Sequence, residues 1–496
     1  MQYISTRGNH HPVTSSEAIK TGMVPAGGLF VPENLPQINK EFLTAISQMD
    51  YNTLSTEVLR LYLTDYSVAE LNECISAAYN DTNFDQPEIA PLVQVDETYI
   101  LELWHGPTAA FKDMALQIMP RLLVKAMQKT ETQKEVVILV ATSGDTGKAA
   151  LEGFKNVQGT KIICFFPYQA VSKVQELQMT TTDGDNTFVV AVEGNFDDCQ
   201  TAVKNIFGDQ NFVKLAYDNG FELSSANSIN WGRLVPQIIY YFWSYAQLVN
   251  KKAIEVGDKI NIVVPTGNFG NILAGYYALQ MGLPVNRFIC ASNTNNVLTD
   301  FLNTGVYDRR RNFYQTSSPS MDILISSNLE RFLFEITGHD GEAVSKWLSE
   351  LNTEGVYTID AGTQAKISDI MEGGFADEDE ITAIIASVFN KTGYVLDPHT
   401  AVGYHVYMEY RNRTKDYTPT ILTATANPYK FNSSVLTALK PNSNISDEFD
   451  MVKVLHDISG LPVHNAVQDL DKKTVLHNKV IKTDELPSVV KDILNF

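Results

Sequence analysis

The chain has 496 residues, of which 44% are hydrophobic and 19% charged, so two or three packed domains are expected and disorder is not. A net charge of −20 would repel a phosphate backbone, which argues against nucleic-acid binding. The start of the chain lacks an apolar signal segment, and no apolar run is long enough to cross a bilayer, so no membrane partner is expected. The cysteines are far apart, which disfavours a metal site or a disulfide framework and favours a reducing cytoplasm: Cys74, Cys164, Cys199 and Cys290.

The chain changes character near residue 95. Residues 1–95 are expected to form a mainly helical domain, with helical stretches at 41–49 and 54–63. A strand is then predicted at 98–104, followed by helical spacing over 113–129.

Apolar strands alternate with helices in the remainder of the chain. The predicted strands lie at 135–142, 161–167, 187–194, 259–266, 287–292 and 419–425. The predicted helices lie at 145–154, 230–248, 267–281 and 433–440. This alternation predicts an α/β fold with two doubly wound, mostly parallel sheets. We expect residues 96–128 and 213–496 to form a large domain and residues 129–212 a small one.

Four polar or glycine-rich segments follow predicted strands, where ligands bind in open α/β sheets: residues 104–113, 141–148, 264–271 and 423–431. In the third segment, VPTGNFGN, glycines allow close backbone approach and a helix start presents unpaired N–H groups. This arrangement suits a phosphate, although an ordinary strand-to-helix turn has the same pattern.

The segment ATSGDTGK is not an ATP-binding P-loop. That loop requires a glycine where this chain has Thr142 and a Ser or Thr where it has Ala149. What remains is a turn that opens a helix, which is able to hold a carboxylate or to act as a simple helix cap.

The other two segments offer a lysine and two hydroxyls. Lys112 lies near a helix start, where the helix dipole lowers the pKa of an amine and favours Schiff-base chemistry, although most lysines are solvated surface groups. His105 is expected to be structural. Thr423 and Thr425 end the last strand, where a hydroxyl is able to bond a ring nitrogen or simply to pack at a strand edge. Together the four segments contain the parts of a pyridoxal-phosphate (PLP) site.

Seven motifs in order resemble the threonine synthase family: HGPTAAFKD, TSGDTGKAA, NSINWGR, VPTGNFGNILAGYYA, SPSMDI, LDPHTAVG and TATANPYKF. The openings YISTRG and GGLFVPE also match, so the resemblance spans essentially the whole chain, and the length indicates the long branch of the family. The resemblance implies a fold-type-II PLP enzyme.

The resemblance also implies roles for individual residues. Lys112 matches the Schiff-base lysine, and Thr425 matches the hydroxyl facing the pyridine nitrogen. The residues that match the family's cup for the cofactor phosphate are Gly267, Asn268, Phe269, Gly270 and Asn271. The turn for the substrate carboxylate matches Ser143, Gly144, Asp145 and Thr146. Asn227 and Asn230 both remain candidates for the ring hydroxyl. The candidates for the substrate phosphate are Arg331, Lys430 and Arg7.

The implied reaction converts O-phospho-L-homoserine and water to L-threonine and phosphate, the last step of threonine biosynthesis. No metal is expected, and the enzyme is expected to be a monomer or a small homo-oligomer. One departure concerns substrate positioning, because Asn427 and Tyr429 replace the His and the small residue expected in the last motif. The alternatives are a threonine dehydratase, a phospho-lyase of the same fold type, or a non-catalytic binding protein, which would not need Lys112.

Overall fold

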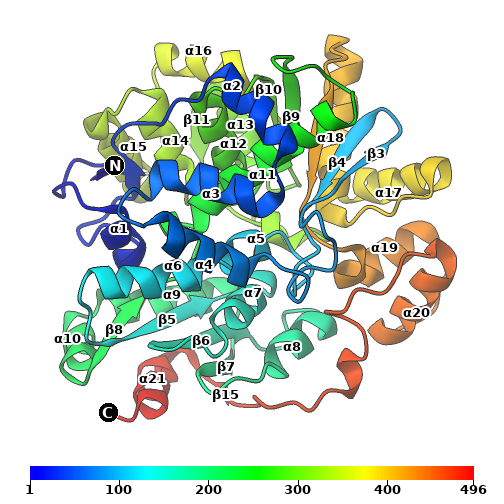
Figure 1. Ribbon diagram of the computed structural model, residues 1–496. Helices are drawn as coiled ribbons and strands as arrows, with labels where there is room; N and C mark the ends of the chain where they lie inside the picture. Colours follow the sequence, from blue (N-terminus) through cyan, green and yellow to red (C-terminus); the bar gives the residue numbers. More distant parts are fainter.

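The computed structural model describes residues 1–496, apart from the side chain of Asp197. Figure 1 shows two α/β layers, one above the other, with the N-terminal helices along one side. Among the described residues, no helix combines the length and the apolar character needed to cross a membrane.

The N-terminal region contains the expected helices and a small sheet that the sequence did not predict. The helices are α1 (Ser15–Thr21), α2 (Lys40–Ala45), α3 (Tyr51–Tyr62) and α4 (Val68–Ala78). Strands β1 (Tyr3–Ser5) and β2 (Phe30–Pro32) pair in antiparallel fashion. Local capping explains the helix starts, since Thr14 and Ser67 each form a capping box with a glutamate three residues later.

The large sheet has six strands in the order β13-β10-β9-β14-β4-β3. Its members are β3 (Leu92–Val95), β4 (Thr98–Glu102), β9 (Ile260–Pro265), β10 (Val285–Ser292), β13 (Met371–Phe375) and β14 (Thr420–Ala424). All neighbours are parallel except the edge hairpin β3–β4. The carboxyl ends of β4, β14 and β9 therefore lie side by side at one edge of the sheet.

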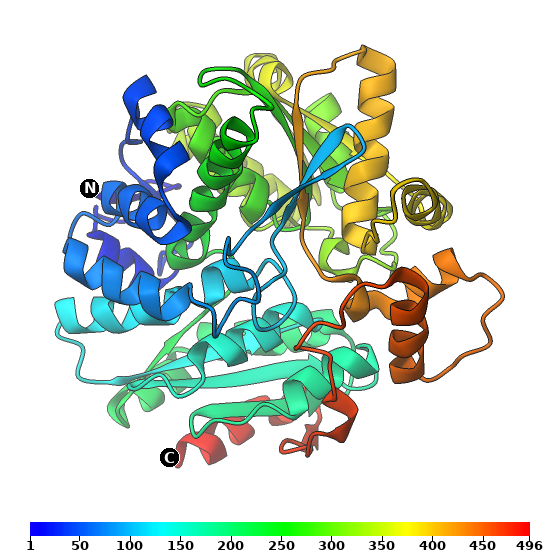
Figure 2. The same ribbon diagram turned by 45° about the vertical axis from the view of Figure 1, so that its right-hand side comes forward.

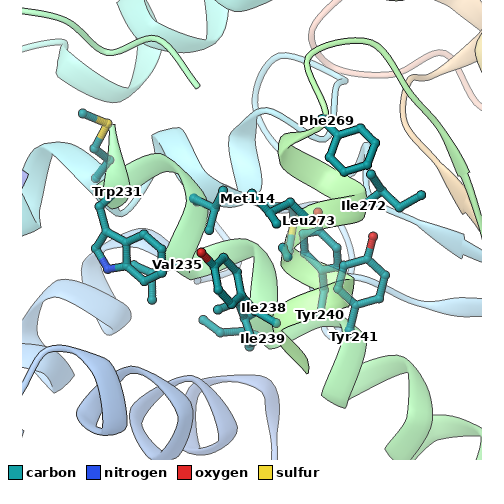
Figure 3. Close-up of a cluster of buried hydrophobic side chains, with 14 of the residues drawn as sticks. Met114, Trp231, Val235, Ile238, Ile239, Tyr240, Tyr241, Phe269, Ile272 and Leu273 are labelled. Carbon is teal, nitrogen blue, oxygen red and sulfur yellow. The ribbon is translucent and has the colours of Figure 1, made fainter. Parts of the chain in front are cut away.

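Helices cover both faces of this sheet, which is why its central strands β9 and β14 are buried along their whole length. On β9, Ile262 and Val264 belong to one core cluster, whereas Val263 belongs to another. The first face packs on α11 (Trp231–Asn250) and α12 (Gly270–Met281), whose facing side chains appear in Figure 3. The second face packs on α18 (Pro398–Thr414), which lies beside α17 (Glu378–Thr392).

The remaining elements of the large layer surround this core. They are α13 (Val297–Thr304), β11 (Val306–Asp308), α14 (Leu329–Ile336), α15 (Gly341–Thr353), β12 (Val356–Thr358), α16 (Ala361–Ile370), α19 (Asn432–Leu439) and α20 (Glu448–Ser459). Figure 2 shows α19 and α20 beside the lower layer.

The small sheet has the order β15-β7-β6-β5-β8 and is parallel throughout. Its strands are β5 (Glu135–Ala141), β6 (Thr160–Pro167), β7 (Thr187–Val192), β8 (Phe221–Ser224) and β15 (Val480–Ile481). Its helices are α7 (Asp145–Phe154), α8 (Lys173–Thr180), α9 (Phe196–Gly208), α10 (Gln210–Asp218) and α21 (Leu486–Leu494).

Two strands of the small sheet lie outside the boundaries predicted for the small domain. β8 begins at residue 221, beyond the predicted boundary at 212, and β15 comes from the C-terminal end of the chain. Both are edge strands, and β15 has only two residues, so neither has the continuous apolar pattern that identifies a buried strand. Tertiary pairing with β5 and β7 decides their placement.

The predicted helix over 113–129 is interrupted. It consists of α5 (Asp113–Leu116) and α6 (Met119–Lys129), with Pro120 in the first turn of α6. Proline lacks the N–H that would continue the helix, so a new helix starts there. By contrast, Pro236 lies inside the continuous helix α11.

Candidate active site

The four segments predicted to bind ligands converge where the two layers meet. Three follow β4, β9 and β14 of the large sheet, and the fourth follows β5 of the small sheet. Contacts between their side chains cross the two layers, since Asp145 of α7 lies 3.5 Å from Lys112 and 2.7 Å from Lys430. The site therefore lies at the carboxyl ends of the strands, as predicted.

The loop that carries Lys112 forms backbone hydrogen bonds with the residues that directly follow β14. The N–H of Phe111 donates to the Thr425 carbonyl at 2.8 Å, and the N–H of Asn427 donates to the Ala109 carbonyl at 3.0 Å. Ala109 has φ of +58°, which turns the chain sharply before the lysine. These bonds fix the backbone of Lys112 beside the end of β14.

The Lys112 side chain is buried and has two polar neighbours. Its Nζ donates to Ser320 Oγ at 3.1 Å and lies 3.5 Å from Asp145 Oδ2. Burial lowers the pKa of Lys112, as do the positive charges of Lys430 and Arg233, while Asp145 opposes the shift. The helix dipole expected to lower this pKa comes from an α5 of only four residues, and burial is the main cause of the shift.

Asp145 and Lys430 form a buried ion pair. Lys430 Nζ lies 2.7 Å from Asp145 Oδ1 and also donates to the Thr108 carbonyl at 2.9 Å. Burial raises the pKa of Asp145, but the charges of Lys430 and Lys112 outweigh it and hold that pKa well below its usual range. Both residues were predicted to bind substrate, and the structure places them against each other at the site.

The turn before α7 leaves its N–H groups available. Thr142 Oγ1 accepts from the N–H groups of Gly144 and Gly147 at 3.0 and 2.9 Å, which closes the turn. Gly144 has φ of +134°, and a Cβ there would lie 2.6 Å from Gln175. Thr142 occupies the N–H groups of Gly144 and Gly147, but those of Asp145 and Thr146 have no partner among the described residues, so these two suit an anion such as a carboxylate. Ser143 and Thr146 are half-buried beside this turn.

The glycine-rich segment after β9 forms a tight cup. Phe269 has φ of +63° and precedes the start of α12, where no side chain of the described residues caps the helix. A Cβ on Gly267 would lie 2.5 Å from the Ser320 carbonyl oxygen, whereas the nearest atom to a Cβ on Gly270 would be Asn328 Nδ2 at 3.5 Å, an ordinary contact distance. The exposed Asn268 is held through its carbonyl, which accepts two bonds at 3.1 Å from Asn328.

Asn271 provides the test of whether this cup fits a phosphate. Its Oδ1 accepts from the hydroxyls of Tyr240 and Tyr241, both at 2.6 Å, which orients the amide group. Figure 3 shows both tyrosines on α11 beside α12. The Asn271 Nδ2 is consequently a buried donor without a partner among the described residues. Such a donor beside an open helix N-terminus fits the phosphate of PLP.

The two threonines that end β14 have different environments. Thr423 is fully buried and its hydroxyl donates to the Val263 carbonyl at 3.4 Å. No hydrogen-bond partner of the Thr425 hydroxyl occurs among the described residues, although the Thr425 carbonyl holds the Lys112 loop. Thr425 thus remains the better candidate for a ring nitrogen.

The two candidate asparagines for the ring hydroxyl can also be separated. Asn230 caps α11 through Gly232 at 2.8 Å and donates to the Ile19 carbonyl at 2.9 Å, so both ends of its amide are used. Asn227 is half-buried, and its side chain carries no such bonds among the described residues. Asn227 is therefore the remaining candidate.

Arg331 and Arg7 are bonded within the protein. The three guanidinium nitrogens of Arg331 donate to Phe30 O, Asn328 Oδ1 and Ile229 O at 2.6–2.9 Å. Arg7 forms a two-point ion pair with Glu330. These contacts favour a structural role for both arginines, because Arg331 supports the cup through Asn328 and the charge of Arg7 is already matched.

Arg233 was not singled out from the sequence, although it ends the motif NSINWGR. Its Nη1 donates to the Ala226 carbonyl at 2.5 Å, and its Nε is buried without a partner among the described residues. Burial lowers the pKa of Arg233 to about 10. The sequence did contain a signal for Arg233, because it is a charged residue in the mostly apolar helix α11, and a buried charge requires a partner.

The departure at Asn427 and Tyr429 has a structural explanation. Asn427 Oδ1 accepts from the N–H of Tyr429 at 3.0 Å and caps the short helix Pro428–Phe431, which carries Lys430. The buried Tyr429 donates its hydroxyl to the Leu461 carbonyl and so ties the C-terminal segment to this helix. Both residues therefore hold the short helix that carries Lys430.

Three family models cover the chain. The model "Threonine synthase N terminus" matches residues 2–79, "Pyridoxal-phosphate dependent enzyme" matches residues 75–425, and "Threonine synthase, C-terminal" matches residues 400–481. Threonine synthase from Saccharomyces cerevisiae is 38% identical over 488 residues, which cover 91% of each chain. The chain belongs to the threonine synthase family of pyridoxal-phosphate-dependent enzymes.

A solved structure supports this assignment. PLP-bound threonine synthase from Brucella melitensis superposes with a TM-score of 0.87 at 35% identity, covering 100% of this chain and 98% of that one. This likeness confirms the predicted fold-type-II architecture. A human relative named "Threonine synthase-like 1" is 40% identical over 471 residues, and the match covers 92% of this chain but only 62% of that longer protein.

Proposed function

We propose that this protein is a threonine synthase, which converts O-phospho-L-homoserine and water to L-threonine and phosphate in the last step of threonine biosynthesis. The observation that carries the proposal is a buried lysine beside a phosphate cup with an unpartnered Asn271 donor, in a chain of this family. Four buried free thiols support a reducing, cytoplasmic setting.

The cofactor would be held by three parts of the large layer. Lys112 would bond it covalently, residues Gly267 to Asn271 would hold its phosphate at the start of α12, and Thr425 would face its ring nitrogen. Asn227 would contact the ring hydroxyl. When bound, PLP supplies an electron sink for carbanion chemistry at the substrate.

The substrate requires groups for two anions and a movable proton. The N–H groups of Asp145 and Thr146 at the start of α7, which Thr142 does not occupy, would bind its carboxylate. Arg233 and Lys430, both buried cations near Lys112, would face its phosphate. The lowered pKa of Lys112 favours the neutral amine that removes a proton from the substrate α-carbon. Burial of this region excludes bulk water, so the added water must enter at a defined position.

The test is phosphate release from O-phospho-L-homoserine with L-threonine quantified in parallel. Equal amounts of both products support the proposal, and Lys112→Ala should lower the formation of both products strongly. Phosphate released without threonine would instead identify a phospho-lyase. Deamination of L-threonine by the same preparation would identify a dehydratase.

A second experiment separates an enzyme from a binding protein. The purified chain with PLP should absorb in the Schiff-base band, and borohydride should fix the cofactor on Lys112. A reduced adduct on another lysine would contradict the assignment. A chain that binds a metabolite but lacks this band would be a non-catalytic member of the family.

A further inference from the structure

His399, in the motif LDPHTAVG, has a ring whose protonation pattern is set by its partners. The N–H of Ser320 donates to His399 Nε2 at 3.3 Å, so Nε2 is the nitrogen without a proton. His399 Nδ1 then carries the proton and donates to Asp397 Oδ1 at 2.9 Å. Asp397 also caps α18 by accepting from the His399 N–H at 2.9 Å and the Thr400 N–H at 3.3 Å. The ring therefore faces Ser320 as an acceptor.

Ser320 is held on three sides. Its N–H is bound by His399, and its carbonyl oxygen packs against Gly267 of the phosphate cup, where a Cβ would approach to 2.5 Å. Its hydroxyl accepts from Lys112 Nζ at 3.1 Å and donates to Asp145 Oδ2 at 3.3 Å. The single hydroxyl proton points to the carboxylate, so the oxygen lone pairs face the lysine.

These contacts form a continuous path from α18 to the reactive amine. Asp397 orients His399, His399 fixes the backbone of Ser320, and the Ser320 hydroxyl contacts Lys112. His399 and Asp397 are 2% and 1% exposed, so neither contacts bulk solvent and neither can move easily. The edge of the His399 ring also packs on Phe431, at 4.7 Å between ring centroids.

We propose that the His399–Asp397 pair positions Ser320 so that its hydroxyl orients the free amine of Lys112, a role that rests on the proposed function. With one N–H bound to Ser320, the amine lone pair points away from the serine and is presented to the reacting atom. A general base must be oriented in this way for efficient proton transfer. His399 and Asp397 are positioning residues, while Ser320 touches the reactive lysine directly.

Other charged groups face Lys112 from every packed element and remain in all the variants below. They are Asp145 on α7, Lys430 beside α19 and Arg233 on α11. The His399 ring itself helps to lower the pKa of Asp145, so geometry is read from a comparison of two uncharged replacements of His399, of which only one offers a hydrogen-bond acceptor.

The test compares two substitutions at His399. His399→Leu removes the acceptor for the Ser320 N–H, whereas His399→Gln retains an acceptor at the end of a side chain of similar reach. The readout is the rate at which Lys112 of the cofactor-free, full-length chain captures PLP, followed by the Schiff-base absorbance from pH 6 to pH 10. We expect His399→Leu to lower the limiting rate about 3- to 10-fold, the range of one lost hydrogen bond, and His399→Gln to restore it to within about 2-fold.

A double-mutant cycle tests the path itself. Ser320→Ala should slow capture as much as His399→Leu, and the double variant should be no slower than either, because both act through one hydroxyl. In the cofactor-loaded enzyme, kcat should fall while KM stays near that of the unmodified chain. Additive effects would overturn the proposal, as would a His399→Gln variant as slow as His399→Leu.

Failure to fold is separated from these outcomes. Thermal unfolding checks each variant, and Ser320→Ala and His399→Gln still test the path if His399→Leu does not fold. The capture rate requires no turnover, so it distinguishes this proposal from the proposed function. Capture that depends on His399 in a chain that makes no threonine would refute only the function.

Discussion

Two buried polar networks flank the segment from His105 to Lys112, and they differ in how their charges are balanced and in the donors that border them. His105 is bonded at both ring nitrogens, to Asp85 at 2.6 Å and Glu102 at 2.8 Å. Tyr394 donates to the other oxygen of Glu102 at 2.8 Å. The network around Lys112 also contains buried charges, and it borders on two donors without partners, at Asn271 and Arg233. The His105 network borders on one, His464 Nε2, which lies 3.5 Å from the Asp85 carboxylate.

The difference shows that buried charge alone does not identify a site. Burial lowers the pKa of His105, but its two carboxylate partners outweigh burial and raise that pKa overall, so its charge is satisfied internally. The pKa of Lys112 falls because burial and neighbouring cations outweigh one carboxylate. Two unsatisfied donors that converge beside a lysine with a lowered pKa mark the Lys112 region as the candidate site for an anionic ligand.

The sharpest test of this comparison replaces one residue from each network. Lys112→Ala should lower threonine formation by about 10²- to 10⁴-fold, because no other group replaces its proton-transfer role. His105→Gln should change turnover little and lower the unfolding midpoint, since it leaves Asp85 and Glu102 without their shared cation. Steady-state kinetics and urea unfolding of both variants check this, and an inactive but stable His105→Gln would reverse the assignment of the two networks.

The next test breaks the ion pair that links the layers. Asp145→Asn should destabilise the chain by about 3–5 kcal/mol, because it leaves Lys430 buried without a countercharge. The pKa of Asp145 is depressed in the folded chain, so its contribution is present above the unfolded pKa and is lost as the pH falls through the folded value. Urea unfolding at pH 7 measures the effect.

The double variant Asp145→Asn with Lys430→Met serves as the control for this pair. It removes both charges, so it should recover much of the lost stability without recovering activity. A double variant as unstable as the single one would show that the loss is not caused by the unpaired lysine.

The phosphate cup offers a matched pair of glycines. Gly267→Ala should weaken PLP binding by about tenfold or more, because its Cβ would press on the Ser320 carbonyl at 2.5 Å and strain the cup. Gly270→Ala should weaken PLP binding only slightly, since the nearest atom to its Cβ lies 3.5 Å away. Only a bulkier residue at this position should block the cup. PLP titration followed by absorbance measures both affinities. Equal affinities for the two variants would show that the backbone of the cup does not bind the phosphate.

The smallest expected effect concerns the two threonines of β14. Thr425→Val should lower kcat about 3- to 10-fold with full PLP occupancy, the range of one lost hydrogen bond to the ring nitrogen. Thr423→Val removes a weak 3.4 Å bond inside the sheet and should affect stability more than turnover. A silent Thr425→Val at full occupancy would exclude that hydroxyl from the site.

The sequence predicted the elements whose pattern is local. The buried strand at 260–265, the turn before α7 and the glycine-rich start of α12 all lie where the periodicity and the glycines placed them. Strand β15 and the break between α5 and α6 were missed, because the first depends on a partner strand and the second on one proline within a helical pattern.

The candidate residues follow the same division. Short motifs in the sequence were enough to select Lys112, the phosphate cup and Thr425 as candidates, because each lies where a strand ends or a helix starts. Only long-range contacts show that the hydrogen-bonding groups of Asn230 and Arg331 already have partners within the protein. They also brought Ser320 and Arg233 to the lysine; both residues lie in motifs of the family resemblance, but the motifs do not say which other segment they contact.

The sequence by itself predicted the α/β pattern, the cofactor class and the candidate lysine, since each rests on patterns within short segments of the chain. Only the tertiary structure decided the charge state and the partners of that lysine. Its pKa depends on burial by several elements, and its neighbours Asp145, Ser320 and Lys430 come from positions 33 to 318 residues away in the chain. Electrostatic energies act through space, so they become defined only when folding brings these charges together.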